Sequence, residues 1–267
     1  RVHHEDLRLE LHMDARAGQV PSLSMDGHVA TLCLNRPDRA NRLDIDDLAV
    51  IRGYLDQVDA NREVRVLCLT ARGRYFCSGF DVGKVSGDDA GALFEATAQA
   101  LERARPLTIA AINGGIYGGA TDLALACDFR IGVQASNLFV PAAEIGLHFY
   151  GSGLERFVSR LGLATAKRIL LAGERLDVCQ MLALGFLDRM VDGAEELRIE
   201  VDRFSRLLAG MAPLAVQGMK RSLNQIARGA LDLATLKRDI ALAQASADLV
   251  EGVLAKAEKR QPVFVGA

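Results

Sequence analysis

The sequence predicts an α/β core followed by a helical region, and three observations lead to this prediction. Apolar segments of strand length alternate with segments of helical periodicity over the first two thirds of the chain. That alternation implies parallel strands joined by helical crossovers. After about residue 195 only helical periodicity remains. The length of 267 residues is long for one domain but within the range of a single α/β body.

The first predicted element is a hairpin. Residues 22–25 and 29–34 have the composition of strands, and Asp26-Gly27 between them is typical of a tight hairpin turn. A helix follows, begun by acidic residues that favour a helix start. Its apolar positions recur at helical spacing and are Leu48, Ile51, Leu55 and Val58. A strand over 64–70 comes next, and then a helix from about 88 to 105 that Pro106 stops.

A strand over 107–112 leads into the glycine-rich segment 113–128, NGGIYGGATDLALACD, which ends as a helix through Ala126 before a strand over 129–133. Three apolar helical faces follow residue 195. Their members are Val201, Phe204, Leu208 and Met211; then Val216, Met219, Leu223 and Ile226; then Ile240, Ala243, Ala247, Val250 and Leu254. These faces need something to cover them, so we expect an oligomer. We divide the chain into an extension (1–21), a core (22–195) and a C-terminal helical region (196–267).

Composition excludes several classes of function. The formal net charge is -2 and the basic residues are scattered, unlike the clustered stripe of a nucleic-acid-binding protein. No apolar run approaches the roughly 18 residues that cross a bilayer. Five widely spaced cysteines lack metal-ligand spacing, so we expect free thiols in a cytoplasmic protein and no metal site. We therefore expect neither nucleic acid nor a membrane as a partner.

The glycines of the 113–128 segment stand at a strand-to-helix corner, where backbone N–H groups lack partners in the helix. Glycine there lets a ligand approach the backbone closely. A dinucleotide site is disfavoured because the glycines do not follow the GxGxxG spacing. A serine-nucleophile elbow is also disfavoured, because the chain contains no GxSxG motif. An oxyanion hole remains.

A second loop supports the oxyanion hole. Residues 76–82, FCSGFDV, also follow a buried strand and place a glycine before the N–H of Phe80. Two adjacent parallel strands whose carboxyl ends each offer such a donor can bind one carbonyl oxygen. Each donor can contribute about 3–4 kcal/mol to stabilising a developing oxyanion.

Motifs along nearly the whole chain, from about 22 to 265, resemble the crotonase (enoyl-CoA hydratase/isomerase) superfamily. They are Leu34-Asn-Arg-Pro37, Phe76-Cys-Ser-Gly-Phe-Asp81, Ala111-Ile-Asn-Gly114 with Gly118-Gly119, Cys127-Asp128, Ile145-Gly-Leu147, Leu171-Ala-Gly173, Ala183-Leu-Gly-Phe-Leu187 and Glu258-Lys-Arg-Gln-Pro-Val-Phe264. The resemblance implies a spiral of repeated ββα units with C-terminal helices that pack a homotrimer or a dimer of trimers. It also implies an acyl-CoA substrate whose thioester enolate is stabilised. Coenzyme A then arrives as part of the substrate, and no separate cofactor is expected.

The resemblance assigns the oxyanion donors to the N–H groups of Phe80 and Gly119. Asp122 stands where hydratases of the family carry their first catalytic glutamate, about one helical turn after Gly119. The second catalytic glutamate normally follows a proline, but here Ala142 follows Pro141. Glu144, two residues later, would replace it only if the chain is locally shifted.

The remaining candidates surround these residues. His148 and Tyr150 stand where some family members place a further pocket residue, and either could donate or relay a proton or merely line the wall. Asp81 is expected to order its loop, and Lys84 to contact a CoA phosphate. Lys259 and Phe264 resemble the edge of the family's adenine pocket, in the same or a neighbouring subunit. The substrate-binding candidates are Cys77, Ser78, Asp81, Lys84, Gly118, Pro141, Ala142, Lys259 and Phe264.

Three functions remain open after these observations. The first is a hydratase or isomerase that acts on an enoyl-CoA, with Asp122 as its acid/base. The second is another reaction of the superfamily, such as decarboxylation, thioester hydrolysis or C–C cleavage, with His148, Tyr150 or Glu144 taking part. The third is a CoA-binding homologue without catalysis, suggested by Ala142 in place of an acid.

Overall fold

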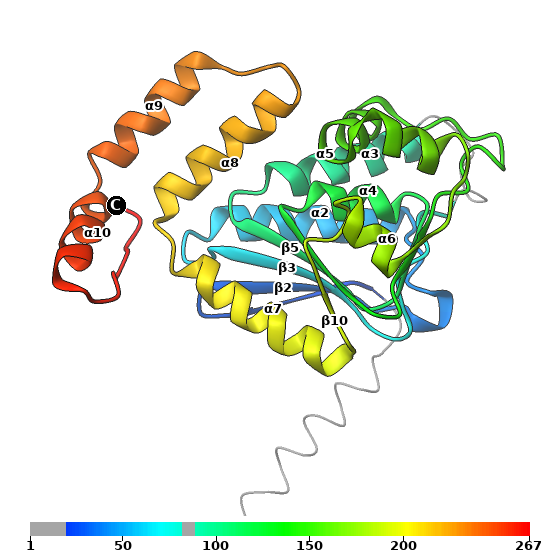
Figure 1. The fold of residues 1–267 in the computed structure, drawn as a ribbon, viewed down its shortest axis with the longest axis horizontal. Coiled ribbons are helices and arrows are strands. Elements are labelled where there is room, and N and C mark those ends of the chain that lie inside the picture. Colours follow the sequence, from blue (N-terminus) through cyan, green and yellow to red (C-terminus); the bar gives the residue numbers. More distant parts are fainter. Residues whose placement is uncertain (1–19, 82–88) are drawn as a thin grey trace, which may run out of the picture.

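The computed structural model describes residues 20–81 and 89–267, and its fold is built on two sheets (Figure 1). The larger sheet has six strands in the order β1–β2–β3–β5–β7–β10, and the smaller has four in the order β4–β6–β8–β9. The larger sheet consists of β1 (Ser22–Asp26), β2 (Val29–Leu34), β3 (Val66–Ala71), β5 (Leu107–Ile112), β7 (Phe129–Val133) and β10 (Arg189–Val191). The smaller consists of β4 (Tyr75–Cys77), β6 (Gly115–Tyr117), β8 (Asn137–Phe139) and β9 (Leu176–Asp177).

Three successive ββα units contribute three strands to each sheet. Each unit sends its first strand to the larger sheet and its second to the smaller sheet, and then forms a helix. The helices of these units are α3 (Asp89–Arg103), α4 (Ala120–Ala126) and α5 (Gly151–Leu170). Strands of successive units pair in parallel, whereas β1 and β2 form the antiparallel hairpin. The predicted α/β class and its repeated ββα units are confirmed.

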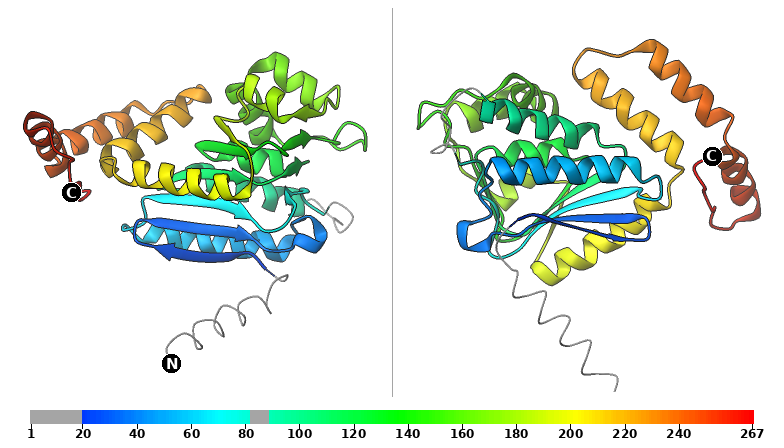
Figure 2. Two further views of the ribbon diagram at one scale, coloured as in Figure 1. Left: turned by 60° about the horizontal axis from the view of Figure 1, so that its bottom comes forward. Right: turned by 180° about the vertical axis from the view of Figure 1, so that it is seen from behind.

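The central strands of the larger sheet are buried on both faces. Along β3 the side chains alternate, with Val66 and Cys68 in one apolar cluster and Leu67 and Leu69 in the other. Helix α7 (Ala194–Ala209) covers the first cluster with Phe204 and Leu208, while α2 (Ile45–Ala60), α3 and α4 cover the second (Figure 2). This explains why β3 reads as a continuous apolar run rather than an alternating one.

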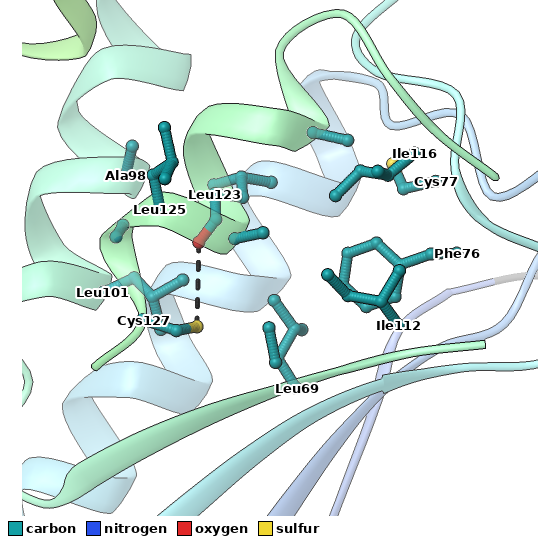
Figure 3. Packing of buried hydrophobic residues seen from close by; sticks show 14 of the residues in the cluster. Leu69, Phe76, Cys77, Ala98, Leu101, Ile112, Ile116, Leu123, Leu125 and Cys127 are labelled. Carbon is teal, nitrogen blue, oxygen red and sulfur yellow. Dashed lines mark hydrogen bonds between the residues drawn. The ribbon is translucent and has the colours of Figure 1, made fainter. Parts of the chain in front are cut away.

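The core between α4 and the larger sheet supports the glycine corner. All seven residues of α4 are buried, and the Cys127 thiol that follows it donates to the Leu123 carbonyl at 3.6 Å (Figure 3). Burial raises the pKa of the Cys77 and Cys127 thiols to about 12. These thiols are therefore apolar packing groups and not nucleophiles.

Two sequence predictions differ from the structure. The strand predicted over 64–70 begins later, at Val66, and runs to Ala71. The third apolar set does not lie on one helix, because Ser246 caps a new helix and divides the set between α9 (Leu233–Gln244) and α10 (Ala247–Glu258). The chain reaches α9 through α8 (Pro213–Ala227), and α8 to α10 extend away from the sheets (Figures 1 and 2). Within the described ranges, no helix is both long and apolar enough to span a membrane.

The predicted acidic start of α2 is a capping box. Asp44 accepts from the N–H of Asp47 at 3.1 Å, and the Asp47 carboxylate accepts from the N–H of Asp44 at 3.0 Å. Asp47 is only 1% exposed, and one of its oxygens, Oδ1, has no hydrogen-bond partner among the described residues. Burial raises the pKa of Asp47 from 3.8 to about 6, although Arg36 lies 2.9 Å from its other oxygen.

This burial predicts a pH-dependent effect of Asp47→Asn. Because the folded protein raises the pKa of Asp47 to about 6, its stabilising contribution is complete at low pH and is lost as pH rises through 6. The neutral asparagine does not titrate. The free energy of unfolding of the Asp47→Asn variant, relative to that of the wild type, should therefore increase between pH 5 and pH 8, as measured by urea unfolding. Asp46→Asn, at an exposed neighbouring position, is the control. The prediction would be contradicted if the free energy of unfolding of Asp47→Asn differed from that of the wild type by the same amount at pH 5 and pH 8.

Candidate functional site

The loop after β4 and the corner after β6 touch through their backbones. Gly79 has φ of +95°, and a Cβ placed on it would lie 2.9 Å from the Tyr117 carbonyl oxygen and 3.3 Å from the Gly119 nitrogen. Any larger residue would push the two segments apart, so glycine is required for both the angle and the space. Gly118 has φ of +55° and turns the chain into α4.

This contact places the N–H groups of Phe80 and Gly119 in adjacent segments. Leu43 bonds to the residues on either side of Phe80: its N–H donates to the Gly79 carbonyl at 2.9 Å, and its carbonyl accepts from Asp81 at 3.0 Å. In this parallel bridge the N–H of Phe80 points away from Leu43. Neither the Phe80 nor the Gly119 N–H donates to an acceptor among the described residues. Both donors are therefore candidates for binding a ligand.

Aromatic rings stand beside these donors. A Cβ on Gly119 would lie 2.8 Å from Cζ of Phe94, so the ring of α3 packs directly on the corner. The Phe94 ring centre is 5.7 Å from that of Phe80 and 6.0 Å from that of Tyr150. Tyr150 immediately precedes α5. The rings of Phe80, Phe94 and Tyr150 form an apolar wall beside the corner.

Asp122 lies one turn beyond Gly119 and is fully buried in an ion pair with Arg156 of α5. Its Oδ1 accepts from Nε of Arg156 at 2.7 Å, and its Oδ2 accepts from Nη2 at 2.6 Å. The Tyr150 hydroxyl also donates to Oδ2, at 2.5 Å. Both carboxylate oxygens are therefore engaged, and the negative charge is compensated within the protein.

The pKa values of the two partners follow from this burial. Burial acts first to raise the pKa of the Tyr150 hydroxyl, and the charge of Asp122 raises it further, so the phenol stays protonated. Burial alone would lower the pKa of Arg156, but its hydrogen bonds and charge interaction with Asp122 outweigh burial and raise it. The chemical states at neutral pH are thus a neutral phenol and a cationic guanidinium.

The ion pair continues into α3 and α8. Arg156 Nη1 donates to Glu102 Oε2 at 3.2 Å, and Arg160 Nη2 donates to Glu102 Oε1 at 3.0 Å. Arg228, at the end of α8, also pairs with Glu102, which is only 2% exposed. A series of ion pairs that starts with Asp122 therefore connects α4, α5, α3 and α8.

Two of the acid/base candidates, Glu144 and His148, form no hydrogen bond with Asp122 among the described residues. Glu144 is exposed, and its carboxylate lies 3.3 Å from where a Cβ of Gly173 would stand, in the turn after α5. His148 is exposed, and its Nδ1 contacts the Phe149 carbonyl oxygen at 2.7 Å. Ala142 is buried and follows Pro141 in the same loop. Of the three other acid/base candidates, Tyr150 is the one in contact with Asp122.

Four of the nine predicted substrate-binding residues lie in the two segments that carry the amides: Cys77, Ser78, Asp81 and Gly118. Gly118 donates its N–H to Phe139, and Ser78 donates its N–H to Ala40, both at 2.9 Å. Cys77 is fully buried, so it supports the loop and is not exposed to a ligand. The Asp81 carboxylate lies 3.6 Å from Arg42, which suits the expected role of ordering the loop. Lys84 lies outside the described residues.

The two C-terminal candidates lie at the other end of the larger sheet. The Phe264 carbonyl accepts from Arg65, which precedes β3, whereas the Phe80 loop follows the carboxyl end of β3. Six strand residues, about 20 Å, separate those ends. Lys259 is exposed at the end of α10. Within one chain, neither residue meets the amides.

A cavity of about 990 Å³ also lies away from the amides. It is bounded by strands of the larger sheet, α7 and the C-terminal tail, and its lining includes Cys68, Ser205 and Phe264. Volume alone would favour it as a ligand site, but its arginines are already paired: Arg65 with backbone carbonyls and Arg198 with Glu195. The N–H groups of Phe80 and Gly119, which have no acceptor in the part of the chain that the structure describes, are the more specific candidate site.

Three residues of the site were not identified from the sequence: Phe94, Glu102 and Arg156. Arg156 is more than thirty residues from Asp122 in the chain, and a helix containing several arginines offers no sign of which one is buried. Phe94 matches an ordinary apolar position of a helix. A single sequence holds no signal for such distant pairings.

The buried ion pair predicts unequal effects for two arginines of α5. Arg156→Met would leave the Asp122 charge buried without its partner, which typically costs about 3–5 kcal/mol. Arg168→Met breaks an exposed pair with Glu174 and should cost no more than about 1 kcal/mol. Urea unfolding of both variants measures the difference. Equal losses for the two variants would contradict a stabilising role of the buried pair.

Comparison with known proteins agrees with the motifs and the fold. The family model described as enoyl-CoA hydratase/isomerase matches residues 24–267. The peroxisomal Delta(3,5)-Delta(2,4)-dienoyl-CoA isomerase of Arabidopsis thaliana is 30% identical over 90% of this chain and 93% of its own length. The crotonyl-CoA hydratase of Syntrophomonas wolfei is 28% identical over 91% of this chain and 96% of its own.

A solved structure gives the same result. The enoyl-CoA hydratase of Bacillus anthracis superimposes with a TM-score of 0.85 at 27% identity, covering 93% of this chain and all of that one. The resemblance drawn from the loops of Phe80 and Gly119 is thereby confirmed at the level of the family. The chain belongs to the enoyl-CoA hydratase/isomerase family of enzymes.

Proposed function

We propose that the protein binds an acyl-CoA thioester with its carbonyl oxygen between the N–H groups of Phe80 and Gly119, and stabilises the enolate that forms there. The observation that carries this proposal is the backbone contact at Gly79, which brings together two N–H groups that have no acceptor among residues 20–81 and 89–267. The thioester belongs to the substrate, so the reaction requires no separate cofactor. Each amide would contribute about 3–4 kcal/mol in the transition state.

Proton transfer is assigned to the hydrogen-bonded pair of Tyr150 and Asp122. Asp122 is fully buried, so it reaches a substrate only through the Tyr150 hydroxyl that donates to it. In the forward step the phenol oxygen accepts a proton from the α-carbon while its own proton passes to Asp122. The C–H electrons form the enolate, whose negative oxygen the two amides hold. Reversal of this relay at the γ-carbon moves the double bond without adding atoms.

Isomerisation is favoured over hydration by Ala142. Hydration needs one group to activate water and another to deliver a proton, and the position after Pro141 supplies no acid. Glu144 is directed at the Gly173 turn rather than at Asp122. Both an isomerase and hydratases are among the similar proteins, so their names do not choose between the reactions.

Proton NMR of 2-enoyl- and 3-enoyl-CoA substrates in D₂O tests this assignment. We expect double-bond migration with deuterium entering the α- and γ-carbons, and a fall of about 10²- to 10⁴-fold in kcat for Tyr150→Phe. Tyr54→Phe, on the distant α2, should retain the wild-type kcat. Asp122→Asn should lose activity in parallel with Tyr150→Phe.

Three results would contradict the assignment. Hydrated product would show that Ala142 does not prevent hydration. Unchanged turnover by Tyr150→Phe would show that the Tyr150 hydroxyl does not relay the proton. CoA thioester binding by calorimetry without turnover of any enoyl-CoA would favour a non-catalytic homologue, in which Asp122 serves only the ion pair with Arg156.

We further propose that α8, α9 and α10 pack against other copies of the chain in a homotrimer or a dimer of trimers. Their exposed apolar side chains are more than 45% accessible and would be covered by such packing. They are Met219, Leu223, Ile226, Leu233, Ile240, Leu242, Leu249, Val250, Val253 and Leu254.

Light scattering after size exclusion tests this assembly. The wild type should have three or six times the mass of one chain, and Leu223→Glu should release smaller species because a charge would be buried at the interface. Met25→Glu, at a 43% exposed position on β1, is the control and should not change the mass. A monomeric wild type would contradict the proposal.

A further inference from the structure

Asn41 occupies a conformation and an environment that the proposed reaction does not yet explain. It is 1% exposed and has a left-handed φ of +52°, in the turn between β2 and α2. Among residues other than glycine, asparagine adopts this conformation most readily. A buried polar side chain in a surface turn is unusual and needs partners.

The side chain of Asn41 satisfies all its bonds within this region. Its Nδ2 donates to the carbonyl oxygens of Arg72 at 2.8 Å and Tyr75 at 2.9 Å, which lie at the turn into β4. Its Oδ1 accepts from the N–H of Arg36 at 2.8 Å. One amide group therefore joins the 36–43 segment to the start of the loop that ends at Phe80.

The backbone of the same segment holds the rest of that loop. The Asn41 carbonyl accepts from the Cys77 thiol at 3.0 Å, and the Ala40 carbonyl accepts from the N–H of Ser78 at 2.9 Å. Leu43 then bonds to the residues on both sides of Phe80. Residues 40, 41 and 43 thus form hydrogen bonds with the loop along its length from Tyr75 to Asp81. Of these three residues, Asn41 is the one that also uses its side chain.

We propose that Asn41 is a positioning residue that sets the direction of the Phe80 N–H toward the thioester oxygen. The inference rests on the proposed function, because it assigns Asn41 to the oxyanion hole. Asn41 touches no substrate and acts through the Cys77–Phe80 backbone. Aspartate at this position would lack both donors and would set a charge against the carbonyls of Arg72 and Tyr75.

The test uses two variants and a chromophoric ligand. Asn41→Gly keeps the left-handed φ but removes the side-chain bonds, and Asn41→Asp keeps the shape but removes the donors. A 3-aryl-propenoyl-CoA is the probe, because hydrogen bonds to its thioester oxygen draw electrons along the conjugated chain and shift its absorption to longer wavelength. Asn61→Ala is the matched control, since Asn61 bonds to Glu63 at the opposite end of β3.

We expect both Asn41 variants to bind the probe within about threefold of wild type while losing most of the absorption shift. Their kcat should fall about 10- to 100-fold with KM little changed, because a misplacement of about 1 Å can cost about 100-fold in rate. Amide hydrogen exchange should accelerate across Ser78–Asp81 and remain unchanged in α2. Asn61→Ala should retain the full shift.

A full absorption shift and wild-type exchange at Ser78–Asp81 in either Asn41 variant would overturn the positioning role. Loss of probe binding together with exchange that is faster throughout the protein would also overturn it, since Asn41 would then only maintain the fold. A different result would contradict the proposed function: the wild-type protein would bind the probe without any shift of its absorption.

Discussion

The backbone contact between Gly79 and the Tyr117–Gly119 corner is the constraint on which the candidate site depends. It exists because neighbouring strands of the smaller sheet, β4 and β6, end at the same edge and because Gly79 has no side chain. Two peptide segments that approach this closely can direct N–H groups at one oxygen without using any side chain. The proposed chemistry depends on this contact, since the parallel strands β4 and β6 lead into the two segments that carry the donors.

Two separate supports hold the contact in place. On one side, the 36–43 segment bonds to the loop of Phe80 through Leu43 and the side chain of Asn41. On the other side, α4 is buried along its whole length, and Asp122 ties it to Arg156 of α5. Preorganisation of this kind is what makes hydrogen-bond donors effective, because the protein does not have to reorient them as charge develops.

In the proposed mechanism, Asp122 links stability to proton transfer. A carboxylate with no exposed surface is costly unless it is paired, and Arg156 provides that pairing with two hydrogen bonds. The same pairing leaves the Tyr150 hydroxyl as the route by which its charge can influence a substrate. A carboxylate that served only catalysis would not need the ion pair with Arg156. A carboxylate that served only the fold would not need the hydrogen bond from the Tyr150 hydroxyl.

The parts of the protein that could be predicted from sequence are those governed by local patterns. The apolar run of β5, the acidic start of α2 and the glycines around Gly119 each follow from short-range rules of periodicity, capping and backbone freedom. The break at Ser246 was missed because the apolar spacing continues across it, although a helix N-cap interrupts the backbone. Arg156 and Asn41 were missed as site residues for another reason. Their partners are distant in the chain, and only the packed fold brings them together.

The infrared stretching frequency of a bound thioester carbonyl tests the central claim most directly. With a ¹³C label at the carbonyl of an unreactive acyl-CoA, the band of the bound ligand can be separated from the amide bands of the protein. Two hydrogen bonds from Phe80 and Gly119 would weaken the C=O bond, so the account predicts a clear shift to lower frequency on binding. A carbonyl band at its aqueous frequency in the saturated complex would contradict it.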